Sequence, residues 1–145
     1  HSTGVGKAIL AFSSPEFQEG VIARGLLPVT PYTITDPEVL RRELAETRER
    51  GYSVTRMEMG LNSASVGVPI LDADDNVLGA ISLIVEASRA DVARLAPPIR
   101  AVARGISRQL AARAGGHQAQ AHGIGLAHRG AARPRRFPLH GERDV

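Results

Sequence analysis

The chain has 145 residues and no cysteine, a length that suits one domain and a composition that excludes disulfides and thiolate-bound metals. Its net charge of +3 comes from residues 115–145, where five arginines outnumber two acidic residues, and the remainder is neutral. A neutral body lacks the basic surface of a DNA-binding domain. The sequence shows no signal-peptide pattern and no apolar run near ~18 residues, so we expect a cytoplasmic protein with no membrane contact.

The first fifty residues predict three helices. An apolar run that begins at two glycines predicts the first helix, over residues 4–12. Each of the next two opens with a capping side chain followed by proline and stops at a glycine. Their signals run from Ser14-Pro15 to Gly25 and from Asp36-Pro37 to Gly51.

The sequence period then changes to that of strands. We expect strands over residues 52–57, 63–71 and 77–85, with a polar turn at 72–76 between the last two. The third strand is apolar enough to be covered on both faces or to lie centrally in the sheet. The asparagine and aspartates of the turn lack the glycine and glutamate of a calcium loop, so they indicate only a turn.

An amphipathic helix over residues 89–113 ends the periodic part, with Ser88 as its cap and a break or kink at Pro97-Pro98. Its arginines recur every four residues, at 100, 104 and 108, and predict a solvated face. After Gly115-Gly116 the periodicity stops. We therefore assign a folded domain to residues 1–114 and a basic, His/Arg-rich disordered tail to residues 115–145.

The opening stretch "HSTGVGKAIL" poses a choice between a ligand site and simple packing. A nucleotide-binding phosphate loop would need a hydroxyl after the lysine, and Ala8 stands there, so we reject it. The unpaired amides at a helix start suit a small anion, but glycines also allow a helix to pack tightly. From this stretch alone we favour packing, and we take Lys7 as a solvated residue.

Nothing in the sequence predicts an enzyme. His1 is the only histidine before the tail, and no nucleophile lies beside a base. We expect no metal and no cofactor. For Glu58 we expect a structural partner, such as Arg56 or a backbone amide.

Several segments together resemble the effector-binding domain of IclR-type bacterial transcription regulators, over about residues 1–113. They are the glycine-rich helix start, "YTITDPEVLRRELAETRERGYSV", "VPILDADDNVLGAISL" and "LAPPIRAVARGISRQL". The resemblance implies an α+β, GAF-like fold, with an antiparallel sheet flanked by helices. It also implies a homo-oligomer (a dimer or tetramer) and contact with DNA only through an N-terminal winged helix-turn-helix that this chain lacks.

The resemblance further implies a small organic acid as effector, its carboxylate held by the amides of Gly4 and Val5. The other pocket positions carried over from the family are Thr55, Ser63, Ser65, Ser82 and Ile84. Thr55 and Ile84 stand where carboxylate-binding members have an acidic residue and a second hydroxyl, which predicts a more apolar pocket for a bulkier or aromatic acid.

Two alternatives remain open at this stage. Ser65 fits equally well as a small residue in a tight strand, and the hydroxyl of Ser82 could be satisfied by a neighbouring carbonyl. The whole domain could also act as a pure oligomerisation module without a ligand.

Overall fold

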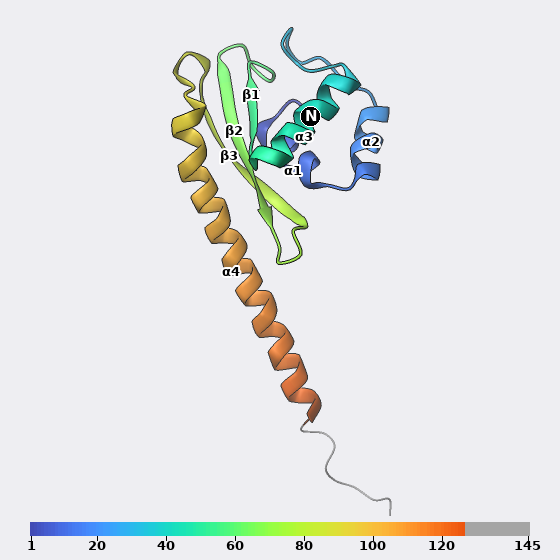
Figure 1. The fold of residues 1–145 in the computed structure, drawn as a ribbon, viewed down its shortest axis with the longest axis vertical. Coiled ribbons are helices and arrows are strands. Elements are labelled where there is room, and N and C mark those ends of the chain that lie inside the picture. The colour runs from blue at the N-terminus through green and yellow to red at the C-terminus, as the bar shows by residue number, and fades with distance from the viewer. Residues whose placement is uncertain (127–145) are drawn as a thin grey trace, which may run out of the picture. The chain divides into compact units, whose positions relative to one another are not determined.

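The computed structural model describes the backbone of residues 1–126 and the side chains of residues 1–113. Contacts divide the chain into two units, residues 1–112 and 113–145, and the fold below is that of the first unit. The elements in chain order (Figure 1) are α1 (Gly4–Phe12), α2 (Pro15–Ala23), α3 (Pro37–Arg50), β1 (Ser53–Arg56), β2 (Ser63–Leu71), β3 (Val77–Glu86) and α4 (Val92–Leu126). The predicted α+β class is therefore confirmed.

Local capping explains where the first three helices begin and end. The hydroxyl of Thr3 accepts a hydrogen bond from the Gly6 amide at 3.0 Å and starts α1. Ser14 and Asp36 cap α2 and α3 in the same way, as their sequence signals predict. Gly51 ends α3 with a φ of 78°, a left-handed conformation that favours glycine.

The sheet is antiparallel with the order β1-β2-β3, so β2 is its central strand (Figure 1). Alternate residues of a strand face opposite sides of a sheet. Residues 63, 65 and 67 of β2 face α1, where Gly67 meets Gly4. Residues 64, 66 and 68 face the other way, and Val66 and Val68 pack against α4.

Two apolar cores follow from this alternation, one on each side of the sheet. The core among the first three helices contains Leu10, Ala11, Leu26, Leu40 and Leu44. The core between β2 and α4 contains Val66, Val68, Ala96, Ile99 and Ala103. Burying large aliphatic side chains stabilises such a fold by about 1.5–3 kcal/mol each, and the two cores fix α1 and α4 against opposite faces of β2.

The predicted environment of β3 is wrong. Within residues 1–126 no strand pairs with its outer side, so β3 is an edge strand and not a central one. Leu78 and Ile84 are 56% and 71% exposed. A short apolar run fits an edge strand as well as a buried one, because its pattern alone does not count the neighbours.

The start of α4 also differs from the prediction. Its cap is Asp91, whose carboxylate accepts from the Arg94 amide at 3.3 Å, whereas Ser88 lies in a short 3-10 turn. The helix then continues through Pro97 and Pro98, so the predicted break there is wrong. Each proline removes one amide donor from the helix, but the turns on either side persist.

The backbone of α4 runs to Leu126, which is later than the predicted helix end at residue 113. The alanines of residues 111–121 favour helix, and this local preference outweighs the two glycines. The rest of the predicted tail, residues 127–145, lies outside the described residues. The division of the chain at residue 114 stays a prediction.

Candidate functional site

The first turn of α1 holds two free amides. Gly6 donates to the Thr3 hydroxyl and Lys7 donates to the Thr3 carbonyl at 2.9 Å. Within the described residues, the amides of Gly4 and Val5 donate to no protein acceptor. A helix N-terminus carries a partial positive charge of roughly half an electron, so these two amides form a small anion-binding group.

A close contact between two glycines sets this turn against the sheet. A Cβ on Gly67 would overlap the carbonyl of Gly4, and a Cβ on Gly4 would lie 2.5 Å from the Ser65 hydroxyl oxygen. The Ser53 hydroxyl donates to the Gly4 carbonyl at 2.6 Å and reinforces the contact. Tight packing and anion binding were alternatives at the sequence level, and the structure shows that the glycines do provide the tight packing.

Hydroxyl groups of the sheet line the space in front of these amides. The oxygens of Thr55 and Ser65 lie 2.6 Å apart, so one donates to the other and one hydroxyl hydrogen of the pair stays available. Ser63 uses its hydrogen on the Gly60 carbonyl at 3.0 Å. The Ser82 hydroxyl has no hydrogen bond to any described residue, so it is free to donate.

A pocket of about 200 Å³ contains all of the residues predicted for the site. Its lining consists of Thr3, Gly4, Val5, Thr55, Met59, Ser63, Ser65, Ser82 and Ile84. At ~30 Å³ per water molecule this space holds about six or seven waters, which suits one small ligand. Ile84 lies at the open side, where it is 71% exposed.

No charged side chain lines this pocket. A buried carboxylate needs hydrogen bonds or a counter-charge, and here only the α1 amides and the strand hydroxyls can supply them. The pocket therefore offers binding groups for an acid but no general base, nucleophile or metal ligand.

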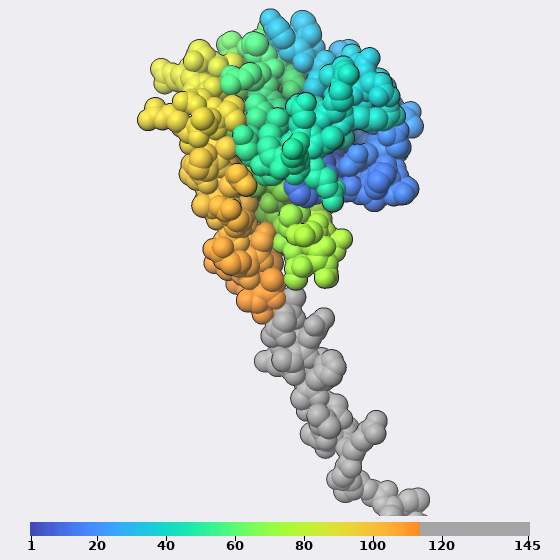
Figure 2. All heavy atoms as spheres, viewed as in Figure 1, coloured from blue at the N-terminus to red at the C-terminus, as the bar shows by residue number. Residues whose placement is uncertain are grey.

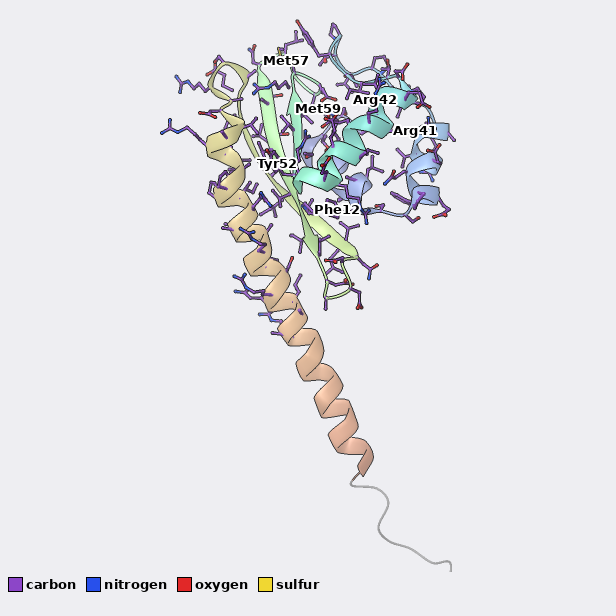
Figure 3. All side chains as sticks on the ribbon, viewed as in Figure 1. Phe12, Arg41, Arg42, Tyr52, Met57 and Met59 are labelled. Carbon is purple, nitrogen blue, oxygen red and sulfur yellow. The ribbon has the colours of Figure 1, made fainter. Side chains whose placement is uncertain are left out.

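The sequence reasoning missed two residues of the lining, Thr3 and Met59. Met59 follows β1 in the loop of residues 57–62 (Figure 3), and its sulfur accepts a hydrogen bond from the Ser2 hydroxyl at 2.9 Å. The hydroxyls of Thr30 and Thr33 hold this loop by donating to the carbonyls of residues 57 and 58. These contacts join segments far apart in the chain, so no local pattern signals them.

Behind the pocket lies an ion pair that the sequence did not predict. The ammonium of Lys7 lies 2.6 Å from a carboxylate oxygen of Glu58, and the two residues are only 1% and 6% exposed. Lys7 is therefore not solvated, and the structural partner of Glu58 is Lys7 and not Arg56. The second carboxylate oxygen of Glu58 is buried without a partner.

The comparison with known families gives this geometry its context. A family profile described as "Bacterial transcriptional regulator IclR C-terminal" matches residues 1–108. The chain belongs to the IclR family. IclR proteins are transcriptional regulators and not enzymes, in agreement with a pocket that contains no catalytic group.

Among IclR-family proteins, the repressor AllR of Klebsiella pneumoniae is 34% identical over 114 residues, which are 76% of this chain and 42% of AllR. The p-hydroxybenzoate hydroxylase transcriptional activator of Acinetobacter baylyi is 31% identical over 90 residues, 61% of this chain and 33% of the activator. The chain thus spans less than half the length of these curated relatives.

Solved IclR structures share the fold. The Thermotoga maritima IclR matches with a TM-score of 0.72 and 35% identity, over 76% of this chain and 46% of that one. An IclR homolog of Microbacterium hydrocarbonoxydans, complexed with 4-hydroxybenzoate, matches with a TM-score of 0.72 and 32% identity, over 77% of this chain and 46% of that one. In the described part of our chain, no helix combines the length and apolar character needed to cross a bilayer.

Proposed function

We propose that the pocket in front of α1 is an effector site that binds one small organic acid. The amides of Gly4 and Val5 hold the carboxylate, and the Ser82 hydroxyl donates a further hydrogen bond. The Thr55–Ser65 pair supplies one more donor, whichever of its two groups donates within the pair. Ser63 accepts or contacts the ligand, and Ile84 covers its body at the open side.

The observation that carries this proposal is the free amide pair at the start of α1. Buried or partly buried amides without partners are costly, and a carboxylate is the ligand whose charge and geometry satisfy two parallel N–H groups. The packing role of Gly4 does not compete with this, because its carbonyl contacts the sheet while its amide stays free.

The size and polarity of the pocket favour an acid with an apolar body. Its volume of about 200 Å³ is below the roughly 300–1,000 Å³ of sites for drug-sized ligands, and Met59 and Ile84 give it apolar walls. Two relatives support an aromatic acid: one is solved with 4-hydroxybenzoate, and another is the activator for p-hydroxybenzoate hydroxylase.

In the full-length protein we propose that this domain controls a DNA-binding domain, acting as a cytoplasmic homo-oligomer. A ligand that binds one arrangement of the subunits more tightly shifts the population towards it. That shift alters the spacing of the DNA-reading helices, which must match the half-site separation on the duplex. The family supports this role, since its members are transcriptional regulators.

The test is a thermal-shift screen of small carboxylic acids, including benzoate and 4-hydroxybenzoate, followed by calorimetry on the chain and its variants. A ligand that binds the folded state raises its stability. Ser82→Ala removes one donor to a charged acceptor, and we expect it to cost about 1–3 kcal/mol of binding, roughly 5- to 150-fold in affinity. Ser88→Ala is the matched control, because Ser88 is exposed and lies outside the pocket.

Unchanged affinity in both Ser82→Ala and Ser65→Ala would refute the role of the hydroxyls. A ligand located away from Gly4 in a structure of the complex would refute the site. If no acid of the panel binds while the chain still forms dimers in sedimentation, the domain is an oligomerisation module instead.

A further inference from the structure

A second and larger pocket lies at the other side of β2, along its edge next to β1. Because β1 has only four residues, its pairing with β2 ends at Gly67, and residues 68–71 have no strand beside them there. The space holds about 450 Å³ between the end of β2, the C-terminal ends of α1 and α3, and α4. The β2–β3 turn and α4 lie next to each other in this part of the first unit (Figure 2).

Arginines dominate the lining of this pocket. Arg100, Arg104 and Arg108 come from successive turns of α4, and Arg48 comes from the last turns of α3. Phe12, Val68 and Ala103 provide an apolar floor between them. The sequence period had predicted only a solvated face for the three α4 arginines, since nothing in the sequence shows that a second helix brings a further arginine opposite them.

Two of the guanidinium groups are positioned by the fold itself. The guanidinium of Arg48 lies 5.4 Å from the centre of the Phe12 ring and donates to the Ala11 carbonyl at 3.1 Å. The guanidinium of Arg100 lies 5.9 Å from the centre of the Tyr52 ring (labelled in Figure 3). Stacking on aromatic rings holds a guanidinium while leaving N–H groups free for an acceptor.

These arginines are not neutralised within the part of the chain whose side chains are described. No carboxylate of residues 1–113 lies within 4.0 Å of the guanidinium groups of Arg48, Arg100, Arg104 or Arg108. Asp72 also lines the pocket, but its carboxylate accepts from the amides of Asp74 and Asn76. Like charges four residues apart destabilise a helix, so this face of α4 gains from a bound anion.

We propose that this arginine pocket binds a small organic oxyanion with two or more negative charges. Guanidinium groups match carboxylate and phosphate oxygens in paired hydrogen bonds, and four of them exceed the charge of the two aspartates, Asp72 and Asp75, on the lining. The charged end of the ligand faces α4 and Arg48, and its hydroxyl donors face the aspartates of the turn. This site is separate from the α1 pocket, whose lining is uncharged.

The experiment is isothermal titration calorimetry of the 145-residue chain with inorganic pyrophosphate and with citrate, at fixed ionic strength set by chloride. The test variant is Arg104→Gln with Arg108→Gln. The matched control is Arg42→Gln with Arg94→Gln, which removes the same two charges from exposed arginines that lie outside the pocket and form no ion pair with described residues. Circular dichroism checks that both variants keep the fold.

We expect at least one of the two probes to bind, a tenfold or greater loss of affinity in the test variant, and a change under twofold in the control. In amide NMR spectra of the wild-type chain, the shifts should centre on Gly51 and Ser107, which line the pocket. The absence of binding by both probes would overturn the proposal, as would equal losses in the two variants or shifts centred elsewhere. Ser82→Ala should leave this binding unchanged, which separates the result from that for the effector site.

Discussion

Replacing Lys7 by methionine tests how the buried charge behind the effector pocket is stabilised. In the wild type, the Lys7 ammonium lies 2.6 Å from one oxygen of Glu58, and the other oxygen has no partner. Methionine has nearly the same length but no charge, so the variant leaves the Glu58 carboxylate buried without any ionic partner. Neither residue is more than 6% exposed, so water does not replace the lost contact.

We expect this single change to lower the free energy of unfolding by about 3–5 kcal/mol, the range for breaking a buried ion pair from one side. The double variant Lys7→Met with Glu58→Leu removes both charges and should recover most of that loss. Replacing a buried pair by apolar groups of similar volume is often neutral, or stabilising by about 1–4 kcal/mol. The measurement is urea unfolding at pH 7, with the free energy extrapolated to water.

Two outcomes would refute this reasoning. A loss below about 1 kcal/mol in Lys7→Met would mean that the pair is solvated in solution. A double variant that loses as much as the two single variants together would mean that the two charges do not interact, since independent sites are additive.

Two further predictions concern the contact of α1 with the sheet and the β2–β3 turn. Gly67→Ala places a Cβ against the carbonyl of Gly4 and should cost about 3 kcal/mol or more in urea unfolding, because backbone must move; a loss under 1 kcal/mol would show that the contact is loose. The backbone amide and then the side-chain amide of Asn76 hold the pKa of the Asp72 carboxyl below its ordinary value. A lowered pKa gives stability above the unfolded-state value of about 3.9 that is lost as pH falls through the folded value, so Asp72→Asn should flatten the fall of melting temperature between pH 5 and pH 2.

Helix and strand positions were predictable from the sequence wherever the signal is local. Asp36, Pro37 and Gly51 fix both ends of α3 through a side-chain cap, a preset φ and a left-handed residue, and none of these needs a tertiary contact. The burial of Lys7 was not predictable, because its partner is 51 residues away in the chain. The edge position of β3 depends in the same way on strand order and not on composition.

The candidate site was predictable only in part, and by a different route. The glycines of α1 indicated either an anion site or packing, and the residues alone did not decide between them. The resemblance to IclR regulators supplied Thr55, Ser65 and Ser82, and the structure places these around one pocket. Spacing in the sequence could not do so, because the strand register that aligns them is set by long-range pairing.

The alternation along β2 has a consequence for how this domain tolerates genetic change. One set of its residues, 63, 65 and 67, supplies hydroxyls and a bare backbone to the effector pocket, while the interleaved valines at 66 and 68 pack against α4. A substitution changes one surface and leaves the other intact. A single-codon insertion or deletion within residues 63–71 would exchange the two sets, placing valines against the bare amides of α1 and serines in the apolar core. Along this strand, reading length is therefore constrained more strongly than residue identity.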